Sequence, residues 1–437
     1  PHFEKMLYDQ AMLAMAYTEA YQATGIKEFE ETAKEIFAYV LRDMTDEEGG
    51  FYSAEDADSE GVEGKFYVWT EDEIRQTLKG DEADLIINVY SIDKIGNFRD
   101  EASGENTGAN ILHLNKSLTE IAFKNKESVD GLKESVEAAR QKLFAVRNKR
   151  VHPHKDDKIL TDWNGLMIAA LAKGAQAFDE PKYAEAAKRA ADFILTGMRR
   201  EDGRILHRYR DGHTAILANV DDYAFLIWGL LELYETVFDV DYLQTALDLN
   251  SEMIKYFWDE KDGGFYFTAE DAEELIVRQK EIYDGAIPSG NSVAVSNLFR
   301  LSRITANTDF EDKANKIMLA FSKDVESAPS GYTQMMVALG FGIGPSYEIV
   351  IVGNPEADDT KEMLSSLGKH FIPYKVILLK HDDQETADIT KIAEYTEYHS
   401  SFDGKATAYV CLDFACKMPV TNTEEMLKLL NVSSSSN

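Results

Sequence analysis

The stretch GGFYSAEDADSEGVEGKFY, residues 49–67, places two aromatic runs around an acidic loop. A second copy, GGFYFTAEDA, occurs at residues 263–272 and repeats Gly-Gly-Phe-Tyr and then Ala-Glu-Asp-Ala, with one extra residue between them. A unit that recurs so far along the chain indicates repeated architecture before it indicates chemistry. We therefore expect these Gly-aromatic turns to join equivalent structural units.

Patterns with the period of an α-helix come in pairs, and a turn of this kind follows three of the pairs. The pairs cover residues 4–25 and 28–44, 162–178 and 181–198, 221–237 and 241–257, and 289–307 and 309–325. The first helix of each pair is unusually apolar, whereas the second is amphipathic and charged. This difference predicts an inner ring of buried helices inside an outer ring that faces water.

Helical hairpins that repeat around a ring predict a mainly α protein with an α/α toroid over residues 1–345. The helical patterns at 70–91 and 129–147 are expected to supply one further unit of the ring. An open α-solenoid is the alternative, but the inner helices carry too few charges to line an open concave face. After residue 345 the runs SYEIVIVG and KVILLK predict a small α/β segment over residues 346–437.

The composition excludes some classes of partner. A net charge of −32 argues against nucleic acid or an anionic membrane surface, and no apolar run approaches the ~20 residues that span a bilayer. The opening PHFEKMLYDQ is not a signal peptide and is expected to continue a longer protein. Cys411 and Cys416 give neither a disulfide framework nor a four-ligand zinc site, and Cys411 is expected to be a small buried hydrophobe. A cytoplasmic location is expected.

Several long strings resemble one family. HFEKMLYDQA, DDKILTDWNGLMIAALA, DDYAFLIWGLLELYE and YDGAIPSGNSVA, together with the stretch at 49–70, resemble the spermatogenesis-associated protein 20 / YyaL-like family over almost the whole chain. The resemblance implies an α/α toroid related to six-hairpin glycosidases and N-acylglucosamine 2-epimerases. Family members carry this toroid behind an N-terminal thioredoxin-like domain, and that domain with its Cys-rich motif is absent from this sequence. The resemblance thus implies a fold and leaves the activity open.

The acidic loop has three interpretations. Asp56, Asp58 and Glu60 stand at positions 1, 3 and 5 of a calcium loop with Gly61 at position 6, but position 12 is Tyr67 instead of a bidentate glutamate. A solvated hairpin is the plainer alternative. The third is a substrate-facing loop on the rim of the toroid, in which Asp56 and Asp58 contact a sugar. No metal or cofactor is predicted.

The starts of the inner helices are the stronger candidates for a site, because the N-termini of parallel inner helices meet at one mouth and favour anionic or hydroxyl-rich ligands. The candidate catalytic acids are Asp9, Asp162 and Asp222. The residues expected to line the cavity are Tyr8, Trp163, Asn164, Tyr223, Ser289 and Asn291. Helix capping is the alternative role for Asp162, Asp221 and Ser289.

Histidines bear on the choice of reaction. RVHPHKDD places His152 and His154 two residues apart, so both rings point to one side of an extended segment on the expected rim. No third metal ligand is evident beside them. His207 lies in another expected rim hairpin.

Two functions of different classes remain. The first is a carbohydrate-active protein that binds, and hydrolyses or epimerises, a small saccharide in the central cavity. Hydrolysis requires a facing pair of carboxylates, and epimerisation requires an acid and a base that titrate near neutral pH. The second is a catalytically silent scaffold that presents a thioredoxin-like domain and binds a partner at an acidic rim.

Overall fold

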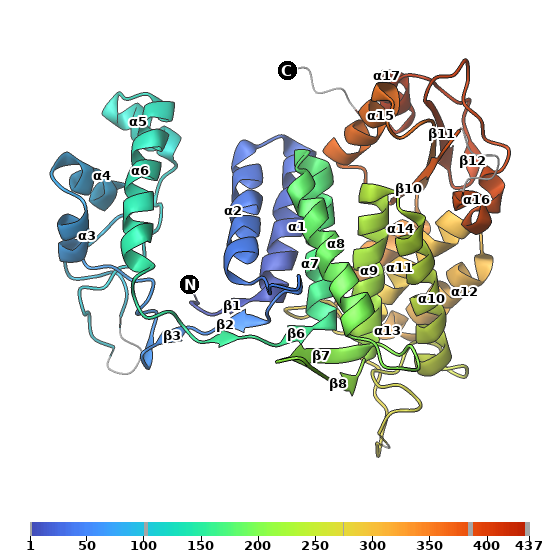
Figure 1. The fold of residues 1–437 in the computed structure, drawn as a ribbon, viewed down its shortest axis with the longest axis horizontal. Helices are drawn as coiled ribbons and strands as arrows, with labels where there is room; N and C mark the ends of the chain where they lie inside the picture. Colours follow the sequence, from blue (N-terminus) through green and yellow to red (C-terminus); the bar gives the residue numbers. More distant parts are fainter. Residues whose placement is uncertain (1, 100–103, 274, 383–387, 433–437) are drawn as a thin grey trace. The chain divides into compact units, whose positions relative to one another are not determined.

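The computed structural model describes residues 2–99, 104–273, 275–382 and 388–432. These residues form two compact units, one comprising residues 1–5 and 54–156 and the other residues 6–53 and 157–437. The second unit holds most of the helices (Figure 1). No described helix is both long and apolar enough to cross a membrane.

Helical hairpins of the second unit form the α/α toroid. Each pairs an inner helix with an outer one: α1 (Leu7–Thr24) with α2 (Lys27–Asp43), α7 (Thr161–Phe178) with α8 (Pro181–Gly197), α9 (Val220–Val237) with α10 (Val240–Phe257), and α11 (Gly290–Thr305) with α12 (Thr308–Ala320). The short α13 (Ser322–Ser327) and the 3₁₀ turn Pro329–Gly331 lead into α14 (Thr333–Ile343). The inner helices pack in the order α1, α7, α9, α11 and α14. The predicted mainly α toroid is confirmed.

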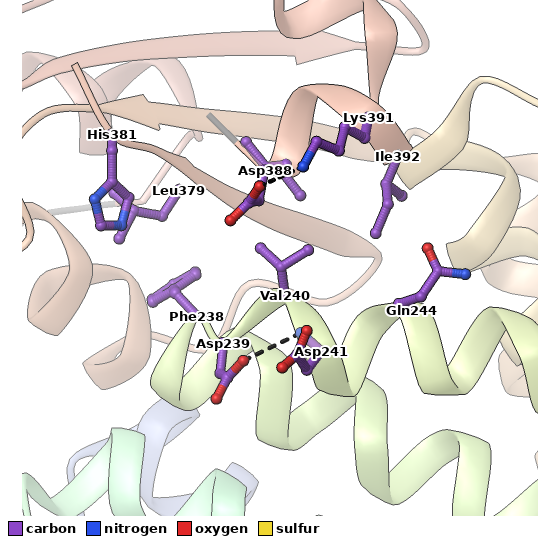
Figure 2. A pocket seen from close by; sticks show the side chains of 11 residues that line it. Phe238, Asp239, Val240, Asp241, Gln244, Leu379, His381, Asp388, Lys391 and Ile392 are labelled. Carbon is purple, nitrogen blue, oxygen red and sulfur yellow. Dashed lines mark hydrogen bonds and ion pairs between the residues drawn. The ribbon is translucent and has the colours of Figure 1, made fainter. Parts of the chain in front are cut away.

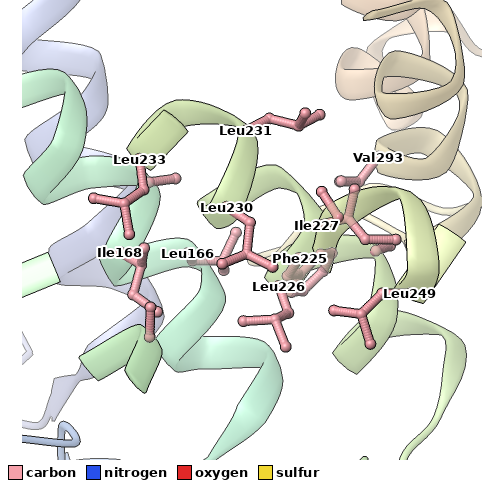
Figure 3. Close-up of a cluster of buried hydrophobic side chains, with 14 of the residues drawn as sticks. Leu166, Ile168, Phe225, Leu226, Ile227, Leu230, Leu231, Leu233, Leu249 and Val293 are labelled. Atoms are coloured by element: carbon pink, nitrogen blue, oxygen red, sulfur yellow. The ribbon is translucent and has the colours of Figure 1, made fainter. Parts of the chain in front are cut away.

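The closest helix contact joins α7 and α9. A Cβ atom on Gly165 would lie 2.5 Å from the carbonyl carbon of Phe225, and one on Gly229 would lie 2.6 Å from the carbonyl oxygen of Gly165. Glycine at both positions therefore lets the two backbones touch. Large apolar side chains such as Leu166 and Leu230 fill the space beside this contact (Figure 3). The apolar composition of the first helix in each pair follows from this burial.

The Gly-aromatic turns are three copies of one structure. Each closes with an isolated β-bridge between the end of an outer helix and the residue after the turn: Thr45 with Phe51, Arg199 with Ile205, and Trp258 with Phe265. Gly49, Gly203 and Gly263 adopt φ values of 114°, 88° and 72°, a region that glycine enters without steric cost. The repeat in the sequence is thus the repeat of this turn.

A buried asparagine on the next inner helix holds two of these turns. Asn164 Oδ1 accepts the Phe51 amide at 2.7 Å, and Asn164 Nδ2 donates to the Phe51 carbonyl at 3.0 Å. Asn291 makes the same pair of bonds with Phe265, at 2.8 and 2.9 Å. Both side chains are fully buried. The two copies of Gly-Gly-Phe therefore each have an Asn partner on an inner helix.

The C-terminal α/β segment shares the core of the toroid. Its sheet has the order β10 (Lys375–Lys380), β9 (Tyr347–Val352), β11 (Thr407–Leu412) and β12 (Ala415–Cys416), with β10 parallel and β11 antiparallel to β9. Along β9, Val350 and Val352 join the core of the helices, whereas Ile349 and Ile351 join a second core. The second core lies under α15 (Asp358–Lys369) and α17 (Thr423–Leu429); α16 (Ile389–Ile392) and the 3₁₀ turn Glu394–Thr396 follow β10. The toroid and the α/β segment therefore belong to one compact unit, and no boundary between units lies at residue 345.

The expectation that the cysteines form no disulfide is wrong. Cys411 and Cys416 are directly opposite each other across β11 and β12 and are joined by a disulfide. The two-residue turn at Asp413 and Phe414 brings them together, because a tight hairpin places residues on either side of it face to face. Cys411 is nevertheless buried, as predicted.

The first unit contains the helices that were expected to complete a toroid repeat. They are α3 (Glu71–Thr77), α4 (Asp81–Val89), α5 (Leu118–Asn125) and α6 (Val129–Arg147). Their apolar side chains surround a separate core that includes Trp69, Ile86 and Leu132. These helices turn their apolar faces toward one another, so they form a small unit with its own interior. The short strands are β1 (Lys5–Met6), β2 (Ala54–Glu55), β3 (Asp58–Ser59), β4 (Val62–Glu63) and β5 (Lys155–Asp156).

Candidate functional site

A histidine strand lies beside the start of α7. Strand β6 (Ile159–Leu160) runs directly into α7 and pairs with β7 (Leu206–Arg210), which pairs in turn with β8 (His213–Leu217). The register sets Leu160 opposite Arg208, and Thr161 Oγ1 donates to the Leu206 carbonyl at 2.7 Å. His207 is between these two contacts and therefore lies next to the first turn of α7.

Asp222, in the first turn of α9, is the centre of the cluster. Its Oδ1 accepts the backbone amide of Asp162 at 3.0 Å, and its Oδ2 accepts the amide of Asn219 at 2.7 Å. Nδ1 of His207 lies 2.9 and 3.0 Å from the two carboxylate oxygens. The side chain of Asp222 is 1% exposed, against 22% for that of His207. Asp222 is thus a fixed carboxylate that holds the imidazole through one nitrogen.

The charges of the cluster shift the proton affinities of its members. Burial alone would lower the pKa of His207, but the hydrogen bond to Asp222 and the charges of Asp222 and Asp162 outweigh it and raise the pKa to about 9. Burial, and then the charge of Asp222, raise the pKa of Asp162 well above its usual range. At neutral pH His207 is therefore a proton donor, and the Asp162 carboxyl holds its proton more strongly than an ordinary aspartic acid.

Asp221 is the neighbouring acid on α9 and approaches α11. A Cβ atom on Gly290 would lie 2.3 Å from Asp221 Oδ1, so a larger residue at the first position of α11 would displace the Asp221 side chain. Asp221 Oδ1 is buried and has no hydrogen-bond partner. Burial, and then the charges of Asp222 and Glu281, raise the pKa of Asp221 to about 7. This carboxyl group can give up or accept a proton at neutral pH.

The same side chains form the one group of possible metal ligands found among the described residues. Ligand atoms of Asp162, His207 and Asp222 all lie within 4.8 Å of one another. Two carboxylates and an imidazole suit a divalent transition metal. However, His207 Nδ1 is hydrogen-bonded to Asp222, and the oxygens of Asp222 also accept two backbone amides. The atoms that would bind such an ion are therefore already engaged in hydrogen bonds.

Aromatic rings from two inner helices meet at this end of the toroid. The rings of Tyr8 and Trp163 are 4.8 Å apart at an interplanar angle of 77°, and both side chains are half-buried. Asp9 lies in the same first turn of α1 as Tyr8 and is also half-buried. The expectation that first-turn residues of neighbouring inner helices approach one another agrees with the Tyr8–Trp163, Asp162–Asp222 and Asp221–Gly290 contacts.

The other predicted lining residues have structural partners. Asn164 and Asn291 bond the Gly-aromatic turns, and Ser289 Oγ caps α11 by accepting the Ser292 amide at 3.2 Å. The Tyr223 hydroxyl lies 3.2 Å from Arg204 Nε and 3.1 Å from a carboxylate oxygen of Glu252 on α10. Tyr223 therefore faces the outer helix, not the inner face of the ring.

The acidic loop belongs to the first compact unit. Asp58 and Ser59 pair with Glu63 and Val62 in a hairpin whose turn is Glu60-Gly61, both with positive φ. Asp56 and Asp58 are exposed, and the Asp56 amide donates to the His154 carbonyl at 2.8 Å. His152 is exposed and packs its ring 4.6 Å from that of Phe66. The loop and the RVHPH segment are therefore neighbours within the first unit, and their expected place on the rim of the toroid stays a prediction.

Sequence reasoning did not select His207 and Asp221 as site residues. For His207 the sequence does contain a signal. The run HRYR has the alternation of a strand and precedes Asn-Val-Asp-Asp, which is a helix-capping pattern. Asp222 stands at the third helical position of that pattern. The pairing of the strand with β6 brings His207 to Asp222, and that pairing is tertiary information. Asp221 could not be distinguished from a capping residue without the approach of Gly290.

Two cavities lie elsewhere in the second unit. One, of about 450 Å³, lies where α10 begins and includes Asp239, Gln244, His381 and Lys391 (Figure 2). The other, of about 1360 Å³, is lined by residues that follow α1 and α7 and by residues 369–374. Both are at the C-terminal ends of inner helices, whereas Asp162 and Asp222 are at the N-terminal ends.

Comparisons with known proteins confirm the resemblance. No family model matches the chain. Over 458 residues the chain is 34% identical to human spermatogenesis-associated protein 20, covering 99% of this chain and 58% of that protein. It is 32% identical over 459 residues to an uncharacterised Caenorhabditis elegans protein, covering 99% of this chain and 62% of that one. The chain thus spans about three-fifths of the length of the curated relatives it matches.

Two solved structures of sugar-acting enzymes match part of the chain. A sugar epimerase from a ruminal bacterium matches with a TM-score of 0.45 and 11% identity, covering 75% of this chain and 62% of that chain. An α-mannanase of Bacteroides thetaiotaomicron matches with a TM-score of 0.44 and 12% identity, covering 84% of this chain and 73% of that chain.

Proposed function

We propose that this relative of spermatogenesis-associated protein 20 is a carbohydrate-active enzyme that moves protons on a small saccharide at the N-terminal ends of its inner helices. The observation that carries the proposal is the His207–Asp222 pair beside Asp162 and Asp221. Four ionisable groups lie in one partly buried place, and three of them, Asp162, His207 and Asp221, have raised pKa values, which is typical of acid–base sites.

Asp222 acts as a positioning residue in this proposal. Both of its oxygens accept backbone amides, and both lie against His207 Nδ1. A carboxylate so occupied cannot attack a sugar carbon, but it fixes the imidazole and stabilises its protonated form. The remaining nitrogen, Nε2, belongs to the more exposed of the two side chains.

Asp221 and His207 take the catalytic roles. Asp221, with a pKa of about 7, removes a proton from the carbon next to the carbonyl of an open-chain reducing sugar. The C–H electron pair moves into the enediol, and protonated His207 or Asp162 donates to the carbonyl oxygen. Return of the proton to the neighbouring carbon gives the ketose, whereas its return to the opposite face of the same carbon gives the epimer, and the donor recovers a proton from an enediol hydroxyl. No electrons are gained or lost overall, so no redox partner is needed.

The chemistry of the site favours this reaction over glycoside hydrolysis. A retaining hydrolase needs two carboxyl groups about 5–5.5 Å apart, one of them a free nucleophile, and an inverting enzyme needs about 6.5–9.5 Å to admit water. Asp222 is fully hydrogen-bonded, which leaves Asp162 and Asp221 on different helices with raised pKa values. A protonated histidine and an acid whose pKa is about 7 suit epimerisation or isomerisation.

A saccharide is the substrate class that suits the surroundings. The Tyr8–Trp163 pair offers aromatic surface at the same end of the ring, and the carboxyl groups offer hydrogen bonds to hydroxyls. Aromatic faces beside a few convergent polar groups bind sugars through their apolar C–H faces and their hydroxyls. The family resemblance adds only a fold, one that is related to six-hairpin glycosidases and N-acylglucosamine 2-epimerases.

Product analysis tests the proposal. The protein is incubated with reducing monosaccharides and short oligosaccharides, and the sugars are separated by anion-exchange chromatography. We expect an epimer or ketose from at least one reducing sugar, lost in Asp221→Asn and retained in Asp309→Asn, an exposed first-turn acid of α12. Release of shorter sugars would identify a hydrolase. Absence of any product across the panel would favour the scaffold function.

A further inference from the structure

We infer that the sugar is held in a recess on the inner face of the toroid, where Trp228 forms the wall and the Glu232–Arg300 ion pair forms the floor. This inference rests on the proposed function, because it names the subsite of the same substrate. It assigns to Trp228 a role in binding that the acid cluster does not supply.

The two faces of α9 show which way Trp228 points. Tyr223 contacts Glu252 of the outer helix α10, so it marks the outward face. Glu232 follows nine residues later, which is about two and a half helical turns, and therefore lies on the opposite face. Trp228 is one turn before Glu232 and donates from Nε1 to Glu232 Oε1 at 3.1 Å. Trp228 thus lies on the inward face.

A chain of ion pairs crosses this inward face from helix to helix. Glu19 of α1 lies 2.9 Å from Lys173 of α7, which lies 3.7 Å from Glu232 of α9. Arg300 of α11 then lies 2.7 Å from Glu232 and 2.9 Å from Glu235. Burial opposes ionisation of Glu232, but the charges of Arg300 and Lys173 outweigh it and lower its pKa to about 2. The floor is therefore a row of fixed, paired charges.

The α/β segment covers the C-terminal side of this floor. Strand β10 packs against α9 and α11, and its residues Val376 and Leu378 belong to the core of the helices. Lys375, at the start of β10, is close enough to Glu235 and Glu232 for their charges to affect its pKa, which burial lowers. The C-terminal side of the floor is therefore closed, and the recess that we infer opens toward the N-terminal ends of the helices, where Asp221 lies.

Two accessible side chains mark the recess itself. Between Asp222 and Glu235 every residue of α9 is buried except Trp228, and between Gly290 and Ile304 every residue of α11 is buried except Ser296. Ser296 is one turn before Arg300, as Trp228 is one turn before Glu232, so both lie at the same depth above the ion pair. Gln334 of α14 approaches Ser296, with Nε2 3.4 Å from Oγ.

This combination recognises a sugar ring. The indole is fixed by its bond to Glu232, so its face is preorganised for stacking against the C–H side of a pyranose. The Ser296 hydroxyl and the Gln334 amide supply hydrogen bonds to hydroxyls. Seven residues separate Asp221 from Trp228, about 10 Å along α9. A small sugar can therefore contact Trp228 while its reacting carbon is near Asp221.

Binding and turnover of the same sugars test the inference. The probes are D-glucose, D-mannose and their N-acetylated 2-amino counterparts, measured by calorimetry and by the exchange of substrate protons with solvent. We expect Trp228→Ala to weaken binding about tenfold or more, since it removes a large stacking surface, whereas Trp228→Phe retains most of the affinity. Trp258→Ala, which removes a tryptophan packed on Phe265 of the outer turn, is the control for lost packing.

A second variant tests the recess independently, in case Trp228→Ala does not fold. Ser296→Leu fills the recess at the same depth without removing any packing, and it is expected to abolish binding. Unchanged affinity in both Trp228→Ala and Ser296→Leu would overturn the inference even if turnover persists. Binding that depends on Trp228 without any turnover would retain the recess and reject the proposed reaction. Absence of binding by all probes in the wild type would overturn both.

Discussion

His207 Nδ1 lies within hydrogen-bond distance of both carboxylate oxygens of Asp222, at 2.9 and 3.0 Å. These residues are on different elements, a strand and the first turn of a helix, and the pair exists because β7 runs beside the start of α7. Asp222 has a second role as a partner of two backbone amides. The protonation of one half-buried imidazole therefore depends on a carboxylate that also bonds the backbone at the starts of two helices.

Asp222→Asn is expected to lower the pKa of His207 from about 9 toward 6.5. The amide removes the negative charge that outweighs the burial of the imidazole. The measurement is an NMR titration of the His207 ring proton, with Asp309→Asn as the control that leaves the pKa unchanged. A His207 pKa that stays near 9 in Asp222→Asn would show that the pair does not control it.

Asp221→Asn is expected to stabilise the protein at alkaline pH. The pKa of Asp221 is about 7 in the folded protein and 3.8 ordinarily, so the folded state holds a proton that the unfolded chain has released. Stability therefore falls as the pH rises from about 4 to 7, and asparagine removes this loss. Thermal unfolding should give a higher Tm for the variant than for the wild type at pH 8, and similar Tm values near pH 3.5. A variant that is less stable at pH 8 would contradict the assignment.

Asn164→Ala and Asn291→Ala are expected each to lower the free energy of unfolding by about 3 kcal/mol. Each change leaves a buried amide and carbonyl of a Gly-aromatic turn without a partner. Asn250→Ala is the matched control, because that asparagine is buried and neither side-chain atom has a hydrogen-bond partner. Chemical denaturation measures the difference. An equal loss in all three variants would mean that the turns are not held by these bonds.

The acidic loop at 56–61 is expected not to bind calcium tightly. Asp58 and Ser59 form a β-hairpin with Val62 and Glu63, and Tyr67 stands where a calcium loop requires a bidentate glutamate. Calorimetric titration should show no micromolar binding. A micromolar site that disappears in Asp58→Asn would refute this prediction.

Most of the toroid could be predicted from the sequence. The pairing of apolar and amphipathic helices follows from burial of the inner row, and the recurrence of Gly-Gly-Phe-Tyr follows from a turn that needs glycine at positive φ. The role of residues 70–147 could not be predicted, because a helical pattern shows which face is apolar and not which core that face joins. The disulfide was missed because the hairpin turn between Cys411 and Cys416 was not recognised.

The site was partly predictable. The starts of the inner helices were expected to converge, and Asp162 does contact Asp222, as Tyr8 contacts Trp163. The distinction between a site residue and a structural one depended on partners in distant parts of the chain. Asn164 and Tyr223 have the same residue types as sugar ligands, but their polar atoms face a backbone turn and an outer helix.

Solvent isotope exchange shows directly whether Asp221 removes a proton from the carbon next to the carbonyl of a sugar. The protein is incubated in D₂O with the same reducing sugars, and the signal of the hydrogen next to the carbonyl carbon is followed by proton NMR. We expect loss of that signal with at least one sugar. Asp221→Asn and His207→Gln should abolish this loss, and Asp309→Asn should retain it. A signal that persists with every sugar, or that is lost equally in Asp221→Asn, would contradict this expectation.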